Sequence, residues 1–298
     1  MRPPAADRRP PRRLRRVAVI PALFTLANGV CGFASILVAS RIHPNDLDPT
    51  AGEAFAQGLQ FLTIAGWLIF AGMVFDVLDG SVARIYRAAS KFGAELDSMC
   101  DVVTFGVAPA FLLLKMGPTP FDHWIFYRVL FVSATLYVVC TIVRLARFNV
   151  ETGLDAESHR YFRGLPSPAA AGCLASVAVF RYELHTSGMP GLEPATLLPY
   201  LRFFAHVLPF LAAGIAVLMV SNFRYPHFVN QSLRGRRPFR MLVSAVLFAA
   251  IVFVAVPGLV LVLAFWSYAV VSLLRRRPPP AAPALAAPTP IAPPQLRA

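Results

Sequence analysis

Residues 59–84 read LQFLTIAGWLIFAGMVFDVLDGSVAR, an apolar run that ends in two aspartates and an arginine. A helix needs about 20 apolar residues to cross a bilayer, so a helix over 59–80 would span a membrane and carry Asp76 and Asp79 at its end. Ionisable side chains at membrane depth are costly unless they have a partner, a wet cavity or an ion. This stretch therefore predicts a membrane helix with a functional site at one end.

The composition of the whole chain also indicates that the protein lies in a lipid bilayer. Of its 298 residues, 57% are hydrophobic and 14% are charged, whereas soluble domains carry about 25% charged residues. The net charge of +13 would also suit a nucleic-acid binder. However, the basic residues gather at the ends of apolar runs and within residues 1–16, where the positive-inside bias and anionic headgroups explain them. We expect an integral membrane protein with membrane lipids, and no nucleic acid, as partners.

The fold class follows from the apolar runs of spanning length. The predicted fold is all-α, a polytopic transmembrane helical bundle of about eight spans in one membrane domain over 16–277. The last two runs are joined at Pro257, where we expect a tight hairpin. Residues 1–15, a basic tail, and 278–298, a Pro/Ala-rich tail, are expected to be disordered. The expected spans are 18–40, 59–80, 97–116, 123–146, 165–184, 198–221, 238–256 and 258–275.

Alternating loop charges predict the orientation. Lys and Arg concentrate in the N-terminus and in 81–96, 147–164, 222–237 and 275–277, whereas 41–58, 117–122 and 185–197 are poor in them. Loops rich in Lys and Arg remain on the cytoplasmic side. We therefore expect a multi-pass protein in the cell (inner) membrane, with both termini and the carboxylate site cytoplasmic.

Four carboxylates share the ends of two predicted helices. Asp76 and Asp79 are three positions apart, and Asp97 and Asp101 are four apart, so each pair lies on one helix face. The loop between the pairs is short, which predicts that the two helices are antiparallel and adjacent. We therefore expect all four side chains to meet.

A cluster of four carboxylates would repel itself unless cations lay among its members. No His or Cys lies at ligand spacing with the carboxylates, since Cys100 points to a different helix face, and all-oxygen ligands favour hard ions such as Mg²⁺, Mn²⁺ or Ca²⁺. A pair of such ions suits displacement at phosphorus, where they stabilise the leaving group. The small residues Gly80 and Ala83 would leave room for a ligand beside the helix, and Arg84 would neutralise a phosphate.

The spacing of these residues is DxxDGxxAR, eight further residues, and then GxxxDxxxD, from Asp76 to Asp101. This pattern resembles the signature of the CDP-alcohol phosphatidyltransferase family at every position. The resemblance implies that Asp76, Asp79 and Asp97 hold two divalent ions, Mg²⁺ or Mn²⁺, with Asp101 near the second ion. It also implies that Asp101 is the general base. The residues implied to contact the CDP-lipid are Gly80, Ala83, Arg84 and Gly93.

Further segments resemble the membrane-embedded phosphatidylserine synthases of that family. They lie at 21–33, 144–149, 162–168 and 220–226. Eight spans, a six-helix family core with a C-terminal hairpin, also suit this group, and the family resemblance implies a homodimer. Arg144 and Arg147 lie on one helix face, where they would meet the carboxylate of serine, a lipid phosphate or a bilayer headgroup. Asn28, inside the first apolar run, either bonds a neighbouring helix or borders the site.

The predicted reaction joins CDP-diacylglycerol and L-serine to give phosphatidylserine and CMP. Attack by the serine hydroxyl on the lipid-side phosphorus would be assisted by the metal pair, with Asp101 as base. One alternative is the same chemistry with glycerol 3-phosphate, inositol or choline as acceptor. A transporter with an acidic metal site and a noncatalytic scaffold are the others.

Overall fold

The computed structural model describes most of the predicted membrane domain. The described residues are 19–43, 46–47, 51–85, 91–118, 124–154, 162–186, 194–221, 223–225 and 253–274. The two predicted tails, 1–15 and 278–298, and most of the predicted span 238–256 lie outside these residues.

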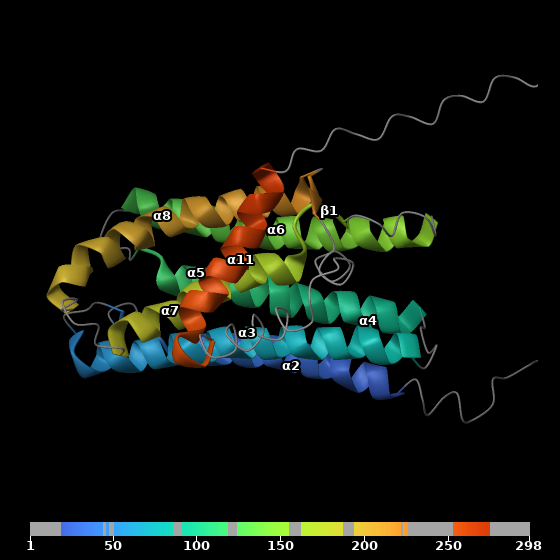
Figure 1. Cartoon of the computed structure of the whole chain (residues 1–298), viewed down its shortest axis with the longest axis horizontal. Helices are drawn as coiled ribbons and strands as arrows, with labels where there is room; N and C mark the ends of the chain where they lie inside the picture. Colours follow the sequence, from blue (N-terminus) through green and yellow to red (C-terminus); the bar gives the residue numbers. More distant parts are fainter. Residues whose placement is uncertain are drawn as a thin grey trace, which may run out of the picture.

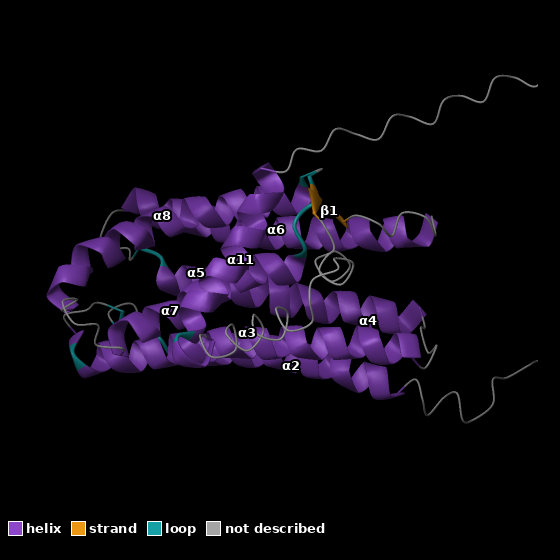
Figure 2. Cartoon of the chain, viewed as in Figure 1, coloured by secondary structure: helices purple, strands orange, loops and turns teal. Residues whose placement is uncertain are grey.

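Helices make up nearly all of the described chain (Figure 2). They cover seven of the eight predicted spans, with the span predicted at 97–116 built from α4, a π-helix η2 and α5 in direct succession. Pro257 begins the last described helix, where its missing N–H costs no hydrogen bond. The elements are α2 (Val19–Ser40), α3 (Glu53–Ile85), α4 (Lys91–Asp101), η2 (Val102–Val107), α5 (Ala108–Met116), α6 (Trp124–Leu154), β1 (Phe162–Arg163), α7 (Ser167–Thr186), α8 (Pro194–Val220), β2 (Arg224–Tyr225) and α11 (Pro257–Leu274).

The helices form an elongated bundle with α7 near its centre. Helix α2 packs along α3, and α6 packs along α8 (Figure 1). Helix α7 lies against α3 and also carries α11, which crosses it obliquely (Figure 1). Helices that are adjacent in the chain and helices that are far apart in it thus enclose one common core.

The surface of this bundle is apolar in the way a bilayer requires. Leu23, Val30 and Phe33 of α2 are each more than half exposed, whereas Asn28 on the opposite face is completely buried. Five described helical stretches are long and apolar enough to cross a membrane. Apolar side chains that face outward and polar ones that face inward fit a lipid solvent. The predicted polytopic helical bundle is confirmed.

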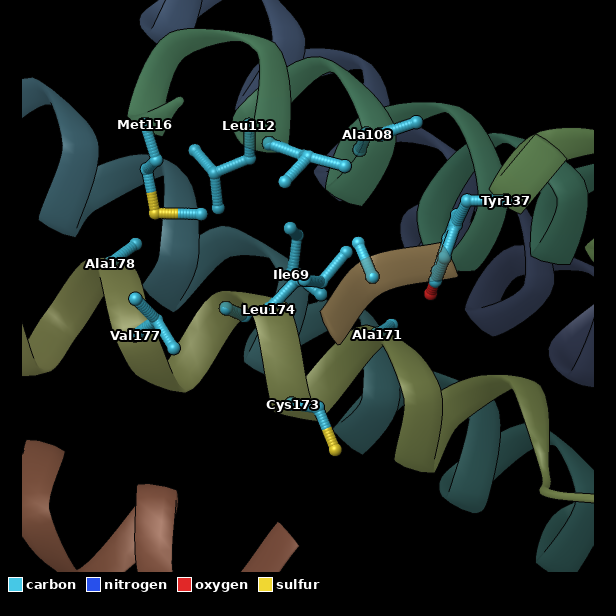
Figure 3. Close-up of a cluster of buried hydrophobic side chains, with 14 of the residues drawn as sticks. Ile69, Ala108, Leu112, Met116, Tyr137, Ala171, Cys173, Leu174, Val177 and Ala178 are labelled. Carbon is cyan, nitrogen blue, oxygen red and sulfur yellow. The ribbon is translucent and has the colours of Figure 1, made fainter. Parts of the chain in front are cut away.

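The apolar core lies where α3, α5, α6 and α7 meet. Ile69, Leu112 and Leu174 are fully buried there, and Figure 3 shows them pointing toward one another from three helices. Tyr137 is also fully buried, and its hydroxyl donates to the Phe105 carbonyl at 3.1 Å. This hydrogen bond satisfies the phenol and ties α6 to η2.

A two-residue β pair ties the start of α7 to the end of α8. Phe162 pairs with Tyr225 and Arg163 with Arg224, in antiparallel register. Gly164 follows with a φ of 83°, and its N–H donates to the Phe223 carbonyl at 2.8 Å. A Cβ at this position would collide with the Met219 carbonyl oxygen, so only glycine allows this close approach. The pair fixes where α7 begins.

Candidate functional site

The carboxylates predicted from the sequence meet at one end of the bundle. Helix α3 carries Asp76 and Asp79, and α4 carries Asp97 and Asp101. Carboxylate oxygens of Asp76, Asp97 and Asp101 lie within 4.8 Å of one another. Asp79 is not part of this group, but it lies close enough to Asp97 to interact with it. The structure therefore brings all four predicted carboxylates into one neighbourhood and three of them to metal-ligand spacing.

The arrangement of these oxygens fits a divalent cation. The Asp97 Oδ1 atom is buried and has no hydrogen-bond partner among the described residues. A buried carboxylate oxygen without a donor is costly, and a cation would satisfy it. The donors in the group are all oxygen atoms, the ligands that hard ions prefer. Asp76, Asp97 and Asp101 could thus hold a metal ion.

Helix α2 supplies a third wall of the site. The side-chain amide of Asn28 donates to Asp101 Oδ1 at 2.9 Å. The Thr25 hydroxyl lies within hydrogen-bond reach of Asp79 Oδ2 and of the Pro21 carbonyl. Of the two roles open to Asn28, packing and bordering the site, the structure gives it both. Thr25 was not among the predicted site residues, although it lies on the same helix face as Asn28, one turn earlier.

The route by which the carboxylates meet differs from the expected helix pair. Helix α4 packs mainly against α2, and α2 packs in turn along α3. The pairs on α3 and α4 therefore approach each other beside α2, rather than across a close α3–α4 contact. The physical reason is the small residues of α2, which let the backbones of η2 and α4 come close to it.

Gly32 shows how close that approach is. A Cβ built on Gly32 would lie 2.5 Å from Thr104 Oγ1 and 2.7 Å from Thr104 Cα. Thr104 lies in the π-helix that directly follows Asp101, and its hydroxyl donates to the Asn28 carbonyl at 2.9 Å. π-helical turns often occur at functional sites. The same contact thus positions the Asn28 backbone and the segment after Asp101.

We expect Gly32→Ala to destabilise the protein by about 1–3 kcal/mol, because overpacking against backbone atoms forces helices apart. Thermal unfolding of the detergent-purified protein would show a lower midpoint. The matched control is Gly214→Ala in α8, where a Cβ would meet nothing within 4 Å. An unchanged midpoint for Gly32→Ala would contradict the close contact with Thr104.

Arg144 reaches the carboxylates from α6. Its guanidinium is close enough to Asp76 and Asp101 to interact with both electrostatically. One guanidinium nitrogen donates to the Ser167 hydroxyl at 2.5 Å. Ser167 is fully buried at the start of α7, beside the β pair. The sequence analysis missed Ser167, because a serine at the start of a helix usually serves only as a cap.

Arg147, one turn further along α6, is half-buried and has interaction partners. Two residues later, Asn149 donates to the Ser98 hydroxyl of α4 at 2.9 Å. The segment 144–149 therefore reaches the carboxylate site through Arg144, and it contacts α4 through Asn149.

The signature residues between the carboxylates are placed in part. Gly80 is exposed on α3, and a Cβ there would meet nothing within 4 Å. Gly93 is half-buried at the start of α4. The backbone of Ala83 and Arg84 continues α3, while their side chains lie outside the described residues. The open surface at Gly80 leaves space for a ligand beside Asp76 and Asp79.

Comparison with known proteins gives a consistent result. The sequence model described as CDP-alcohol phosphatidyltransferase matches residues 18–220, more than half of the chain. The chain is 32% identical over 236 residues to the CDP-diacylglycerol--serine O-phosphatidyltransferase of Helicobacter pylori (strain ATCC 700392 / 26695), covering 79% of this chain and 82% of that protein. It is 31% identical over 214 residues to the protein of the same name from Bacillus subtilis (strain 168), covering 70% and 90%. A Mycobacterium tuberculosis (strain ATCC 25618 / H37Rv) protein, again of that name, is 42% identical over 162 residues, covering 52% and 49%.

Proposed function

The chain belongs to the CDP-alcohol phosphatidyltransferase family, and we propose that it makes phosphatidylserine and CMP from CDP-diacylglycerol and L-serine. The observation that carries the proposal is the group of Asp76, Asp97 and Asp101 oxygens within 4.8 Å, with Arg144 beside them. The printed names of the relatives support serine as the acceptor.

Asp101 acts as the general base in this proposal. Asn28 donates to Oδ1 of Asp101, which fixes the carboxylate and leaves its other oxygen for the acceptor hydroxyl. The serine oxygen attacks the lipid-side phosphorus, its proton passes to Asp101, and the bond from that phosphorus to the CMP oxygen breaks. The charged product CMP then leaves.

The four carboxylates hold the metal site in this proposal. Asp76, Asp97 and Asp101 are the ligands closest to one another, and Asp79 joins them beside Asp97. We propose two ions, Mg²⁺ or Mn²⁺, because four carboxylates match the charge of two divalent cations. When bound, such ions neutralise the charge that develops on the phosphates.

The CDP-lipid would lie beside the exposed stretch of α3 that includes Gly80. The lack of a side chain at Gly80 lets a ligand approach the helix backbone. By the family signature, Ala83, Arg84 and Gly93 belong to the same binding surface. The site would open to the cytoplasmic side of the cell membrane, as the loop charges predict, and the protein would act as a homodimer.

Arg144 would bind the carboxylate of serine. Its guanidinium donates to the Ser167 hydroxyl and interacts electrostatically with Asp76 and Asp101, so it lies at the edge of the carboxylate group. A guanidinium binds a carboxylate through two parallel hydrogen bonds. Inositol and choline carry no anionic group, so this contact would favour serine over both of them.

The experiment that tests the proposal is CMP release by the purified protein with CDP-diacylglycerol and Mg²⁺ or Mn²⁺. L-serine, inositol, glycerol 3-phosphate and choline would be compared as acceptors. Release that depends on serine is the expected result. Release with a different acceptor would change the assigned acceptor but keep the assigned reaction type. No release with any acceptor would overturn the proposal that the protein is an enzyme.

Arg144→Gln should lower kcat/KM for serine by about 10- to 100-fold, because a hydrogen bond to a charged group contributes about 1.5–3 kcal/mol. The loss should fall mainly on the KM for serine, measured by CMP release. Arg128→Gln, on the same helix but exposed and stacked over Trp124, is the matched control. A rise confined to the KM for CDP-diacylglycerol would reassign Arg144 to the lipid phosphate.

A further inference from the structure

A second half-buried arginine lies far from the carboxylates. Arg181 is near the end of α7, about 21 Å along the helix axis from Ser167 at 1.5 Å per residue. Its guanidinium makes one hydrogen bond within the described chain, a long one of 3.4 Å to the Met116 carbonyl at the end of α5. A guanidinium has five N–H donors, so most of its capacity is unused there.

No carboxylate balances this charge among the described residues. The nearest in sequence, Glu183, instead accepts from the backbone N–H groups of Gly258 at 2.6 Å and Leu259 at 3.3 Å. Glu183 therefore caps the start of α11. A partly buried cation with no anion among the described residues is costly, which points to an anionic partner.

Arg181 also lines a cavity of about 310 Å³ between α7, α8 and α11. The other walls are almost entirely apolar and include Leu184, Phe204, Val262 and Trp266. Trp266 is held in place because its indole N–H donates to the Cys173 carbonyl at 3.0 Å. Arg181 thus borders an apolar cavity whose volume is at the small end of the range for ligand pockets.

We propose that this cavity binds an anionic phospholipid of the leaflet opposite the carboxylate site. The lipid phosphate would pair with the Arg181 guanidinium through two hydrogen bonds, and part of one acyl chain would fill the apolar space. The rest of the lipid would remain in the bilayer, since the cavity is too small to enclose it. This inference is independent of the proposed reaction and concerns a lipid that is not the substrate.

The test uses native mass spectrometry of the purified full-length chain in a delipidating detergent, with phosphatidylglycerol, phosphatidylcholine or inorganic phosphate added. One phosphatidylglycerol per chain should bind about tenfold more tightly than phosphatidylcholine. Arg181→Gln should remove this preference, because the loss of a charge-assisted bond weakens binding tenfold or more. Arg202→Gln, an exposed arginine on α8, is the matched control and should bind as the native protein does.

A second variant tests the apolar part of the cavity and leaves the Arg181 guanidinium unchanged. Val262→Phe would occupy the cavity and should also weaken phosphatidylglycerol binding, even if Arg181→Gln does not fold. Equal binding of the two lipids, or undiminished phosphatidylglycerol binding by Val262→Phe, would overturn the proposal. Displacement of the lipid by inorganic phosphate alone would also overturn it, since the acyl chain would then contribute nothing.

Discussion

Asp101→Asn is expected to reduce CMP release by 10²-fold or more, with serine and CDP-diacylglycerol both saturating. Loss of a general base alone costs about 10²–10⁴ in rate. The asparagine would also present an amide in place of one of three clustered carboxylates. It would retain the size of the side chain, so the bundle should still fold. Steady-state CMP release and the thermal unfolding midpoint, measured on the same preparation, check both statements.

The matched control for Asp101→Asn is Glu95→Gln, which removes a carboxylate from the same helix. Glu95 is exposed on α4, away from the cluster, so its replacement should leave turnover within about twofold of the native enzyme. An Asp101→Asn protein that turns over at the native rate would refute the assignment of Asp101 as base.

Removal of divalent cations should abolish CMP release, and Mg²⁺ or Mn²⁺ should restore it. Without cations, Asp76, Asp97 and Asp101 would repel one another across less than 4.8 Å. The phosphates of the nucleotide would add further negative charge to the same place. The measurement is turnover after treatment with a chelator and after stepwise return of each ion.

Asp97→Asn refines the metal prediction. The Asp97 Oδ1 atom has no donor within the described structure, so it is the oxygen with most to gain from a cation. Its loss should raise the Mg²⁺ concentration needed for half-maximal turnover by at least about tenfold. Glu95→Gln should leave that concentration unchanged. Full turnover in the presence of chelator would contradict a metal-dependent reaction altogether.

The order of residues along the chain was enough to predict the membrane class and the pairing of the carboxylates. The hydrocarbon core of a bilayer holds no water that could bond backbone N–H and C=O groups. An apolar run that spans it therefore forms a helix, in which every backbone polar group bonds within its own segment. Helical periodicity placed Asp76 with Asp79 and Asp97 with Asp101, as the structure confirms for the helices that carry them. The signature spacing that joins the two pairs gave the family.

Only the tertiary structure decided what surrounds those carboxylates. Asn28 and Asp101 are 73 positions apart, Thr25 and Asp79 are 54 apart, and Arg144 and Ser167 are 23 apart. Spacing within one helix follows from its period, but contacts between helices depend on which small residues let two backbones approach. Gly32 against Thr104 is such a contact, and it makes α2 the third wall of the site. The cavity at Arg181 has the same origin, because α7, α8 and the more distant α11 must pack together before it forms.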